Sequence, residues 1–230
     1  MTTAEARLRS NLEAVRRTIA RACDRAGRDP SDVLIVGAAK QVPADIVAAA
    51  VRAGLSDIGE NYVNELRAKH GVVPGARWHF IGTLQASSAH HVAALADVVQ
   101  TLAGSRPTER LARRAAEAGR VLDALIEVDF TGGRSGAAPE LVPALADHVA
   151  SLPGLRLGGL MTIPAFTTVA EEARATFVRL RELRDRIARD HPEVLELSMG
   201  MSLDYEVAVE EGATMVRVGT ALFGPRAPST

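Results

Sequence analysis

Short apolar runs alternate with helix-like stretches along most of the chain, and this alternation constrains the fold more than any other feature. Most of the runs are rich in Val, Ile and Leu and are too short to form a buried helix. Such alternation is typical of parallel β/α units, and eight units with short connections favour a closed (β/α)8 TIM barrel over an open doubly wound sheet. The expected strands are Val33–Ala39, Asp57–Gly59, Trp78–Gly82, Asp97–Thr101, Leu122–Val128, Leu155–Met161, Val194–Leu197 and Thr214–Val218. The expected helices between them are Ala44–Ala53, Val63–Lys69, Ser88–Leu95, Thr108–Ala118, Pro139–Ala150, Val169–Arg189 and Asp204–Glu211.

An extra helix is expected before the first strand. Apolar residues recur there at spacings of four and three, which predicts one buried stripe on a helix that ends by Gly27. Because no strand precedes this helix, we expect residues 1–27 to pack on the outside of the barrel. No linker or low-complexity tract follows, so residues 1–230 are predicted to form a single domain. The stripe comprises Leu8, Leu12, Val15, Ile19 and Cys23.

Charge and composition narrow the classes of partner. The 230 residues carry a formal net charge of −1, which gives no reason to expect nucleic acid or an acidic membrane surface. No apolar run approaches the roughly 18 residues of a membrane span, and no secretory signal is recognisable, so a cytoplasmic protein is expected. Cys23 is the only cysteine, which excludes an intrachain disulfide. No apolar surface stripe is left over, which mildly favours a monomer.

A lysine, Lys40, follows the first strand at once, in the sequence V-L-I-V-G-A-A-K-Q. In a parallel barrel the C-terminal end of a strand opens onto the active-site mouth. An amine surrounded there by apolar residues would have its charged form disfavoured and could attack a carbonyl as a nucleophile. A solvated lysine on a loop is the alternative, and this strand alone favours that alternative.

Small and polar residues after other strands fit a ligand that carries a phosphate. The loops after strands seven and eight of such barrels commonly hold phosphate, and backbone amides at a helix start bind it without a basic side chain. Together with Lys40 and with Arg217 on the last strand, these loops describe a site for a phosphate-bearing aldehyde, and pyridoxal 5'-phosphate (PLP) fits that description. The candidate binding residues are Asn61 after the second strand, Met161 on the sixth, Ser198, Met199 and Gly200 after the seventh, and Gly219 and Thr220 after the eighth.

The third strand places a histidine inside the barrel. His79 alternates with Trp78 and Phe80, which predicts that His79 faces the interior and that its neighbours face the helices. Such a histidine is either a hydrogen-bonded core residue or part of the cofactor shell. The six histidines show no metal-ligand spacing, so no metal site is expected.

Five segments resemble the YggS/PROSC family of pyridoxal phosphate homeostasis proteins, in order and over nearly the whole chain. The resemblance implies a barrel similar to the N-terminal domain of alanine racemase and a role in intracellular PLP homeostasis. It implies Lys40 as the Schiff-base residue, Arg217 facing the pyridine nitrogen, and phosphate near Ser198, Gly219 and Thr220. Asn61 and His79 match the family's pocket-lining positions, and PLP-dependent apo-enzymes are candidate recipients. The segments are Asp57–Leu66 (D-I-G-E-N-Y-V-N-E-L), Trp78–Gln85 (W-H-F-I-G-T-L-Q), Gly158–Pro164 (G-G-L-M-T-I-P), Leu197–Asp204 (L-S-M-G-M-S-L-D) and Val216–Gly224 (V-R-V-G-T-A-L-F-G).

The chain departs from the family's usual pattern near the expected site. Around Lys40 it reads A-A-K-Q, without the family's serine before the lysine and threonine after it. Leu84–Ser88 reads L-Q-A-S-S where the family has L-Q-S-N-K, so Ser87 and Ser88 replace an asparagine and a lysine. Arg134, before Ser135-Gly136, keeps the charge of the family's K-S-G.

Arg217 bears on whether the chain is an enzyme. Catalysts that use PLP as a full electron sink usually place a carboxylate at the pyridine nitrogen, whereas a permanently charged arginine favours the unprotonated ring. Racemases tolerate the arginine but need a second acid–base group, which alanine racemases take from a separate domain. The tyrosines here, Tyr62 and Tyr205, are equally well explained as packing residues. A non-catalytic PLP carrier is therefore favoured, with a racemase-like PLP enzyme as the alternative and a phosphate-binding barrel enzyme without PLP as a third.

Overall fold

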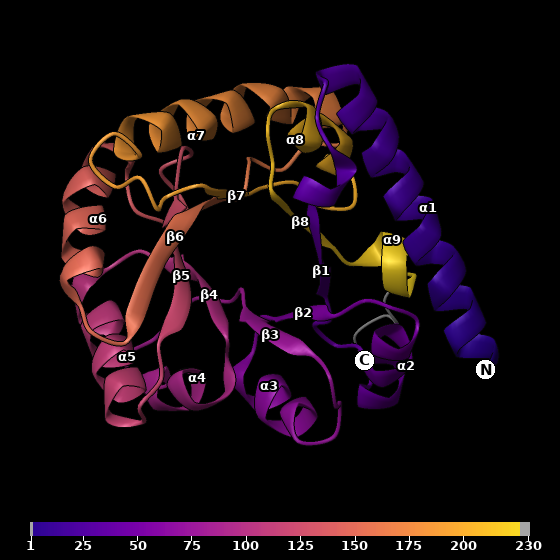
Figure 1. Cartoon of the computed structure of the whole chain (residues 1–230), viewed down its shortest axis with the longest axis horizontal. Helices are drawn as coiled ribbons and strands as arrows, with labels where there is room; N and C mark the ends of the chain where they lie inside the picture. The colour runs from indigo at the N-terminus through magenta and orange to yellow at the C-terminus, as the bar shows by residue number, and fades with distance from the viewer. Residues whose placement is uncertain (1, 226–230) are drawn as a thin grey trace.

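Eight parallel strands form a closed barrel in the computed structural model, which describes residues 2–225 (Figure 1). Each strand pairs with the next along the chain, and β8 pairs with β1, so the ring has no free edge. This confirms the predicted (β/α)8 barrel. The strands are β1 Leu34–Ala38, β2 Asp57–Glu60, β3 Arg77–Phe80, β4 Val98–Leu102, β5 Leu122–Val128, β6 Leu155–Thr162, β7 Glu196–Ser198 and β8 Met215–Val218.

Helices between the strands cover the outside of the barrel. The helix after β4 begins at Ser105, three residues earlier than predicted, because a proline such as Pro107 is tolerated in the first helical turn. The helices are α2 Ala44–Arg52, α3 Val63–His70, α4 Ala89–Leu95, α5 Ser105–Glu117, α6 Val142–Ser151, α7 Arg174–Ile187, α8 Tyr205–Glu210 and α9 Thr220–Phe223. Short 3-10 turns span Pro30–Asp32, Pro139–Leu141 and Ala170–Ala173. No helix within residues 2–225 is both long and apolar enough to cross a bilayer.

The N-terminal helix, α1 (Thr3–Ala26), lies along the outside of the barrel beside α9 and α8 (Figure 1). Its predicted apolar stripe is buried from Leu8 to Cys23. The Asn11 side chain donates a hydrogen bond of 2.8 Å to the carbonyl of Leu222, which fixes α1 to α9. The single-domain prediction covers residues 1–230, of which Met1 and residues 226–230 lie outside the described part.

Two kinds of side chain fill the barrel interior. An apolar cluster of Val98, Leu125, Met161 and Met215 fills the end nearer the N-termini of the strands. Above it lies a polar layer that includes His79, which is fully buried, as the alternation along β3 predicts. Val98, Leu125 and Met215 also line a cavity of about 440 Å³ at the starts of the strands, whereas the polar layer lies towards their C-terminal ends.

Candidate functional site

A cavity of about 400 Å³ opens at the C-terminal ends of the strands. Five of the predicted site residues line it together: Lys40, Asn61, Arg217, Gly219 and Thr220. They come from the ends of β1, β2 and β8, which are neighbours in the barrel. The other lining residues are Ala38, Ile81, Arg134, Ile163, Met201, Ser202 and Leu203.

The other five predicted site residues do not line this cavity. Met161 lies in the apolar cluster inside the barrel, and Met199 packs in the outer core. Gly200 has a left-handed φ of 91°, and its carbonyl accepts a 2.9 Å hydrogen bond from the backbone of Arg217. Ser198 and His79 are fully buried in the polar layer beneath the cavity. These five residues therefore shape the site through packing or through their neighbours.

A chain of side-chain hydrogen bonds crosses the barrel interior from Arg217 to Asp57. Arg217 Nη1 donates to Ser198 Oγ at 2.7 Å, and Ser198 donates to Gln100 Oε1 at 2.7 Å. Gln100 Nε2 lies 2.9 Å from His79 Nδ1, and His79 Nε2 lies 3.0 Å from Asp57 Oδ1. Because an amide nitrogen only donates, His79 accepts at Nδ1 and donates from Nε2. Every hydrogen bond therefore points from the cation towards the carboxylate.

Burial affects the pKa values of Arg217 and Asp57, at the two ends of this series of hydrogen bonds, in different ways. Burial lowers the pKa of Arg217 to about 10, while the nearby carboxylates of Asp204 and Glu127 oppose the change. Arg217 therefore stays charged at neutral pH. Burial acts to raise the pKa of Asp57, but hydrogen bonds from His79 and Ser56 outweigh burial and lower that pKa below its usual value. The series of hydrogen bonds thus has a guanidinium at one end and a carboxylate at the other, connected by Ser198, Gln100 and His79.

Lys40 lies in a tight turn directly after β1. The backbone N–H of Val42 donates to the carbonyl of Ala39 at 3.0 Å, which closes a turn with Lys40 and Gln41 at its centre. Gln41 has a φ of 62°, the left-handed conformation that non-glycine residues rarely adopt, and no other non-glycine residue within 2–225 does so. The turn lifts the Lys40 side chain out of the strand pairing and into the cavity wall.

Three charged side chains surround this turn. Lys69 Nζ donates to the carbonyl of Ala39 at 2.9 Å, to Glu60 Oε1 at 2.6 Å and to Glu65 Oε2 at 2.8 Å. Glu65 Oε2 also accepts a 2.7 Å hydrogen bond from the backbone N–H of Gln41. Glu60 is fully buried, and within the described residues its Oε2 has no hydrogen-bond partner. Burial raises the pKa of Glu60 from 4.5 to about 7, although Lys69 opposes the increase.

Two loops bring polar groups to the rim of the cavity. After β5, the Asp129 carboxylate accepts hydrogen bonds of 2.7 Å from the backbone N–H groups of Thr131 and Arg134, which holds Arg134 at the rim. After β7, the Ser202 hydroxyl accepts from the backbone N–H of Gly219 at 3.2 Å. The glycine-rich loop after β5 is therefore an ordered turn, and Ser202, not Ser198, lies beside the start of α9.

Gly82 lets the loops after β2 and β3 approach each other. A Cβ atom at Gly82 would lie 1.8 Å from the carbonyl oxygen of Asn61, a distance that no side chain tolerates. Glycine at this position therefore keeps Asn61 at the edge of the cavity.

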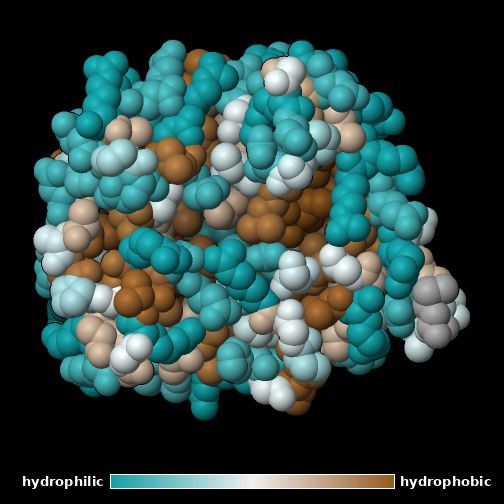
Figure 2. Space-filling model, viewed as in Figure 1, coloured by the Kyte–Doolittle hydropathy of each residue, from teal (hydrophilic) through white to brown (hydrophobic). Residues whose placement is uncertain are grey.

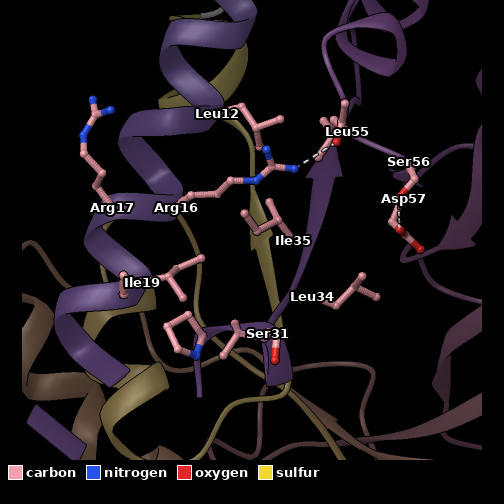
Figure 3. A pocket seen from close by; sticks show the side chains of 14 residues that line it. Leu12, Arg16, Arg17, Ile19, Ser31, Leu34, Ile35, Leu55, Ser56 and Asp57 are labelled. Carbon is pink, nitrogen blue, oxygen red and sulfur yellow. Dashed lines mark hydrogen bonds between the residues drawn. The ribbon is translucent and has the colours of Figure 1, made fainter. Parts of the chain in front are cut away.

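A larger cavity, of about 540 Å³, lies at the opposite end of the barrel, between α1 and the starts of β1 and β2 (Figure 3). Figure 2 shows apolar side chains at the surface in this hollow beside α1. Its walls include Leu12, Ile19 and Leu55, and Arg16 reaches across to the carbonyl of Gly54 at 3.1 Å. Lys40 and Arg217 lie at the other end of the strands, so this hollow is no candidate for the aldehyde site.

Three residues of the site were missed by the sequence reasoning. Gln100 is an amide within the otherwise apolar or hydroxyl-bearing strand Val98–Leu102, and an amide that faces inward there is a recognisable signal. Lys69 follows Glu65 by four residues on a helix, a spacing that is typical of a solvated ion pair and therefore gives no signal. Ser202 lies within a segment that was recognised, but a loop has no periodicity from which to choose it over Ser198.

Comparisons with known proteins identify the family. Residues 10–227 match the family model described as alanine racemase, N-terminal domain. A pyridoxal phosphate homeostasis protein of Aquifex aeolicus is 39% identical over 220 residues, which cover 94% of this chain and 96% of that protein. The chain belongs to the family of pyridoxal phosphate homeostasis proteins.

Solved structures agree with this family assignment. PipY of Synechococcus elongatus PCC7942, in a structure with PLP bound, superposes with a TM-score of 0.80 at 32% identity, over 90% of this chain and 100% of that chain. An alanine racemase of Clostridium difficile 630 gives a TM-score of 0.76 at 16% identity, over 97% of this chain and 58% of that chain. The racemase likeness shows the shared fold alone.

Replacing Gln100 with leucine should destabilise the protein more than the loss of one ordinary hydrogen bond. The change removes the donor to His79 and the acceptor for Ser198, and both partners stay buried. The free energy of unfolding should fall by about 2–4 kcal/mol, measured by urea denaturation. Thr101→Val, which removes a single buried hydrogen bond to the carbonyl of Gly82, is the control. An equal loss of unfolding free energy in Gln100→Leu and Thr101→Val would show that the hydrogen bonds of Gln100 are not coupled in a series.

The raised pKa of Glu60 predicts a loss of stability with rising pH. A carboxyl that binds its proton more tightly when folded stabilises the protein fully below its unfolded pKa of 4.5, and that contribution is lost as the pH rises through about 7. Relative to Glu60→Gln, the wild-type protein should lose about 3 kcal/mol of unfolding free energy between about pH 4.5 and pH 8. Urea denaturation of both proteins across this range tests the prediction, and parallel pH curves would refute it.

Proposed function

We propose that this protein binds PLP in the cavity at the barrel mouth, with Lys40 as the residue that forms a Schiff base, and that it holds and transfers the vitamer in PLP homeostasis. The observation that carries the proposal is the joint placement of an amine and a buried guanidinium, Lys40 and Arg217, in one cavity formed by the neighbouring strands β1 and β8. A relative at 32% identity, PipY, has a structure with PLP bound, which supports the same ligand here.

Lys40 supplies the nucleophile in this proposal. PLP, when bound, provides an electrophilic aldehyde. Lys40 would hold PLP by supplying the amine for a reversible condensation with that aldehyde, in which one water molecule is released on binding and consumed on release. Such reversibility is what a carrier requires.

Arg217 is the group proposed to face the pyridine nitrogen. A guanidinium has five N–H donors, and two of those of Arg217 are held by Ser198 and by the carbonyl of Thr162, at 2.7 and 2.8 Å. Its charge at neutral pH favours an unprotonated pyridine ring, which withdraws electrons weakly from a bound amino acid. This fits a carrier, and since racemases tolerate such an arginine and share the fold, a racemase-like enzyme is the second candidate.

The phosphate is proposed to lie at the loops after β7 and β8. Gly219 and Thr220 line the cavity there, together with the Ser202 hydroxyl. The family resemblance also suggests Ser198, but its hydroxyl is already occupied by Arg217 and Gln100, so the geometry favours Ser202. Asn61 and Arg134 complete the polar rim of the cavity.

Apo-enzymes that depend on PLP are the proposed recipients, and the proposed setting is a cytoplasmic monomer. Cys23 is the only cysteine and is buried, which fits a reducing compartment. An open mouth lets water and acceptor amines reach the bound vitamer, which favours release over turnover.

Borohydride trapping tests the site. Purified protein incubated with PLP should absorb in the visible range, and reduction should fix the cofactor on a peptide that contains Lys40. The chain has only two lysines, Lys40 and Lys69, so peptide mass spectrometry gives an unambiguous position. Lys40→Ala should lose both the absorbance and the adduct. Retention of either in Lys40→Ala, or an adduct on Lys69, would refute the assignment.

Exchange of the α-proton of amino acids separates the carrier from the racemase. In deuterated water, the loaded protein should exchange the α-proton of alanine and of other amino acids no faster than free PLP does, measured by proton NMR. Exchange well above that background would establish the racemase-like alternative.

A further inference from the structure

The chain uses lysine at two positions only, and both lie at the same turn. Of its 27 lysines and arginines, 25 are arginines, and the two lysines are Lys40 and Lys69. Lys69 is 5% exposed, and its ammonium lies against the carbonyl of Ala39, the residue that precedes Lys40. A buried lysine in a chain that otherwise uses arginine calls for a physical reason.

The acceptors around Lys69 supply that reason. An ammonium has three N–H donors that diverge from one nitrogen, whereas a guanidinium presents planar pairs. The three acceptors of Lys69 belong to a strand end, a helix and a turn: Glu60, Glu65 and the carbonyl of Ala39. Each donor therefore meets one acceptor, and the lysine ties β2 and α3 to the backbone that carries Lys40.

The turn itself needs this support. Gln41 is held at a φ of 62°, which costs about 1 kcal/mol or more for a residue with a Cβ atom. Its backbone N–H is fixed by the same Glu65 oxygen that accepts from Lys69. Ala39 and Gln41, the residues on either side of Lys40, are thus held by one group of charges, buried at Glu60 and Lys69 and partly exposed at Glu65. We name this group the turn clamp: Glu60, Glu65 and Lys69.

We propose that Lys69 is a positioning residue for Lys40, and that the turn clamp fixes the Ala39–Val42 turn in the conformation that presents the Lys40 amine to the cavity. Lys69 does not touch the ligand in this proposal and acts through the carbonyl of Ala39 and, by way of Glu65, through the N–H of Gln41. The consequence for binding rests on the proposed function of Lys40, whereas the effect on the turn does not.

Amide exchange in the cofactor-free protein tests the turn directly. In Lys69→Met, the Gln41 amide should exchange with deuterium at least about tenfold faster than in wild type, measured by NMR, because Glu65 loses the cation that holds it. Thr101→Val, which loses a buried hydrogen bond to a backbone carbonyl elsewhere at the mouth, should leave the Gln41 amide unchanged. Unchanged Gln41 exchange in Lys69→Met would overturn the proposal.

A second pair of variants covers the case in which Lys69→Met does not fold. The Glu65 side chain is 26% exposed, so Glu65→Ala removes one member of the turn clamp without emptying a fully buried position. Glu65→Ala should also speed exchange of the Gln41 amide, and Glu65→Gln, which keeps an acceptor oxygen, should restore most of the protection. Equal exchange in Glu65→Ala and wild type would overturn the proposal by itself.

The affinity for PLP distinguishes a positioning role of Lys69 from a role in stability alone, because only a positioning role predicts weaker binding. The dissociation constant for PLP, followed by visible absorbance, should rise about tenfold in Lys69→Met and Glu65→Ala and stay near wild type in Thr101→Val. Wild-type protein that takes up no PLP would refute the proposed function, while amide exchange would still decide the clamp. Faster exchange with unchanged PLP affinity would overturn the positioning role.

Discussion

The buried guanidinium of Arg217 determines which side chains the inside of this barrel must contain. A charge removed from water must be compensated by hydrogen bonds and by an opposite charge. For Arg217 the compensation is spread across the barrel, through Ser198, Gln100 and His79 to Asp57. Five strands each contribute one side chain to this layer, so the arginine is held by the barrel as a whole. The face of Arg217 that lines the cavity is thereby fixed on a rigid support.

The Schiff-base candidate has a different kind of support. Lys40 belongs to a turn outside the strand ladder, with a left-handed residue next to it and a buried cluster of charges beneath it. Glu60 in that cluster carries a raised pKa and an oxygen without a partner among the described residues. One wall of the cavity is therefore fixed by the hydrogen bonds between Arg217 and Asp57 inside the barrel, and the other by ion pairs outside it that change with pH as Glu60 titrates.

The sequence predicted the barrel and much of the cavity, because both follow from local periodicity. Alternation along β3 is sufficient to send His79 inward, and the end of β1 is sufficient to place Lys40 at the mouth. Pairings between distant residues do not follow from periodicity. Ser198 and Gln100 are 98 residues apart, and only the closed ring brings them within 2.7 Å. The spacing of Glu65 and Lys69 is typical of a surface ion pair. The burial of Lys69 could not be predicted, because it depends on which residues pack over that face of the helix.

The scarcity of lysine has a consequence for the chemistry of a reactive aldehyde. Free aldehydes condense with any accessible primary amine, and arginine side chains do not compete because the guanidinium stays protonated. Here one of the two ε-amines is buried and fully engaged by three acceptors, and the other lines the cavity. The composition therefore makes the chain selective among its own side chains, because outside the cavity it offers an aldehyde no accessible lysine.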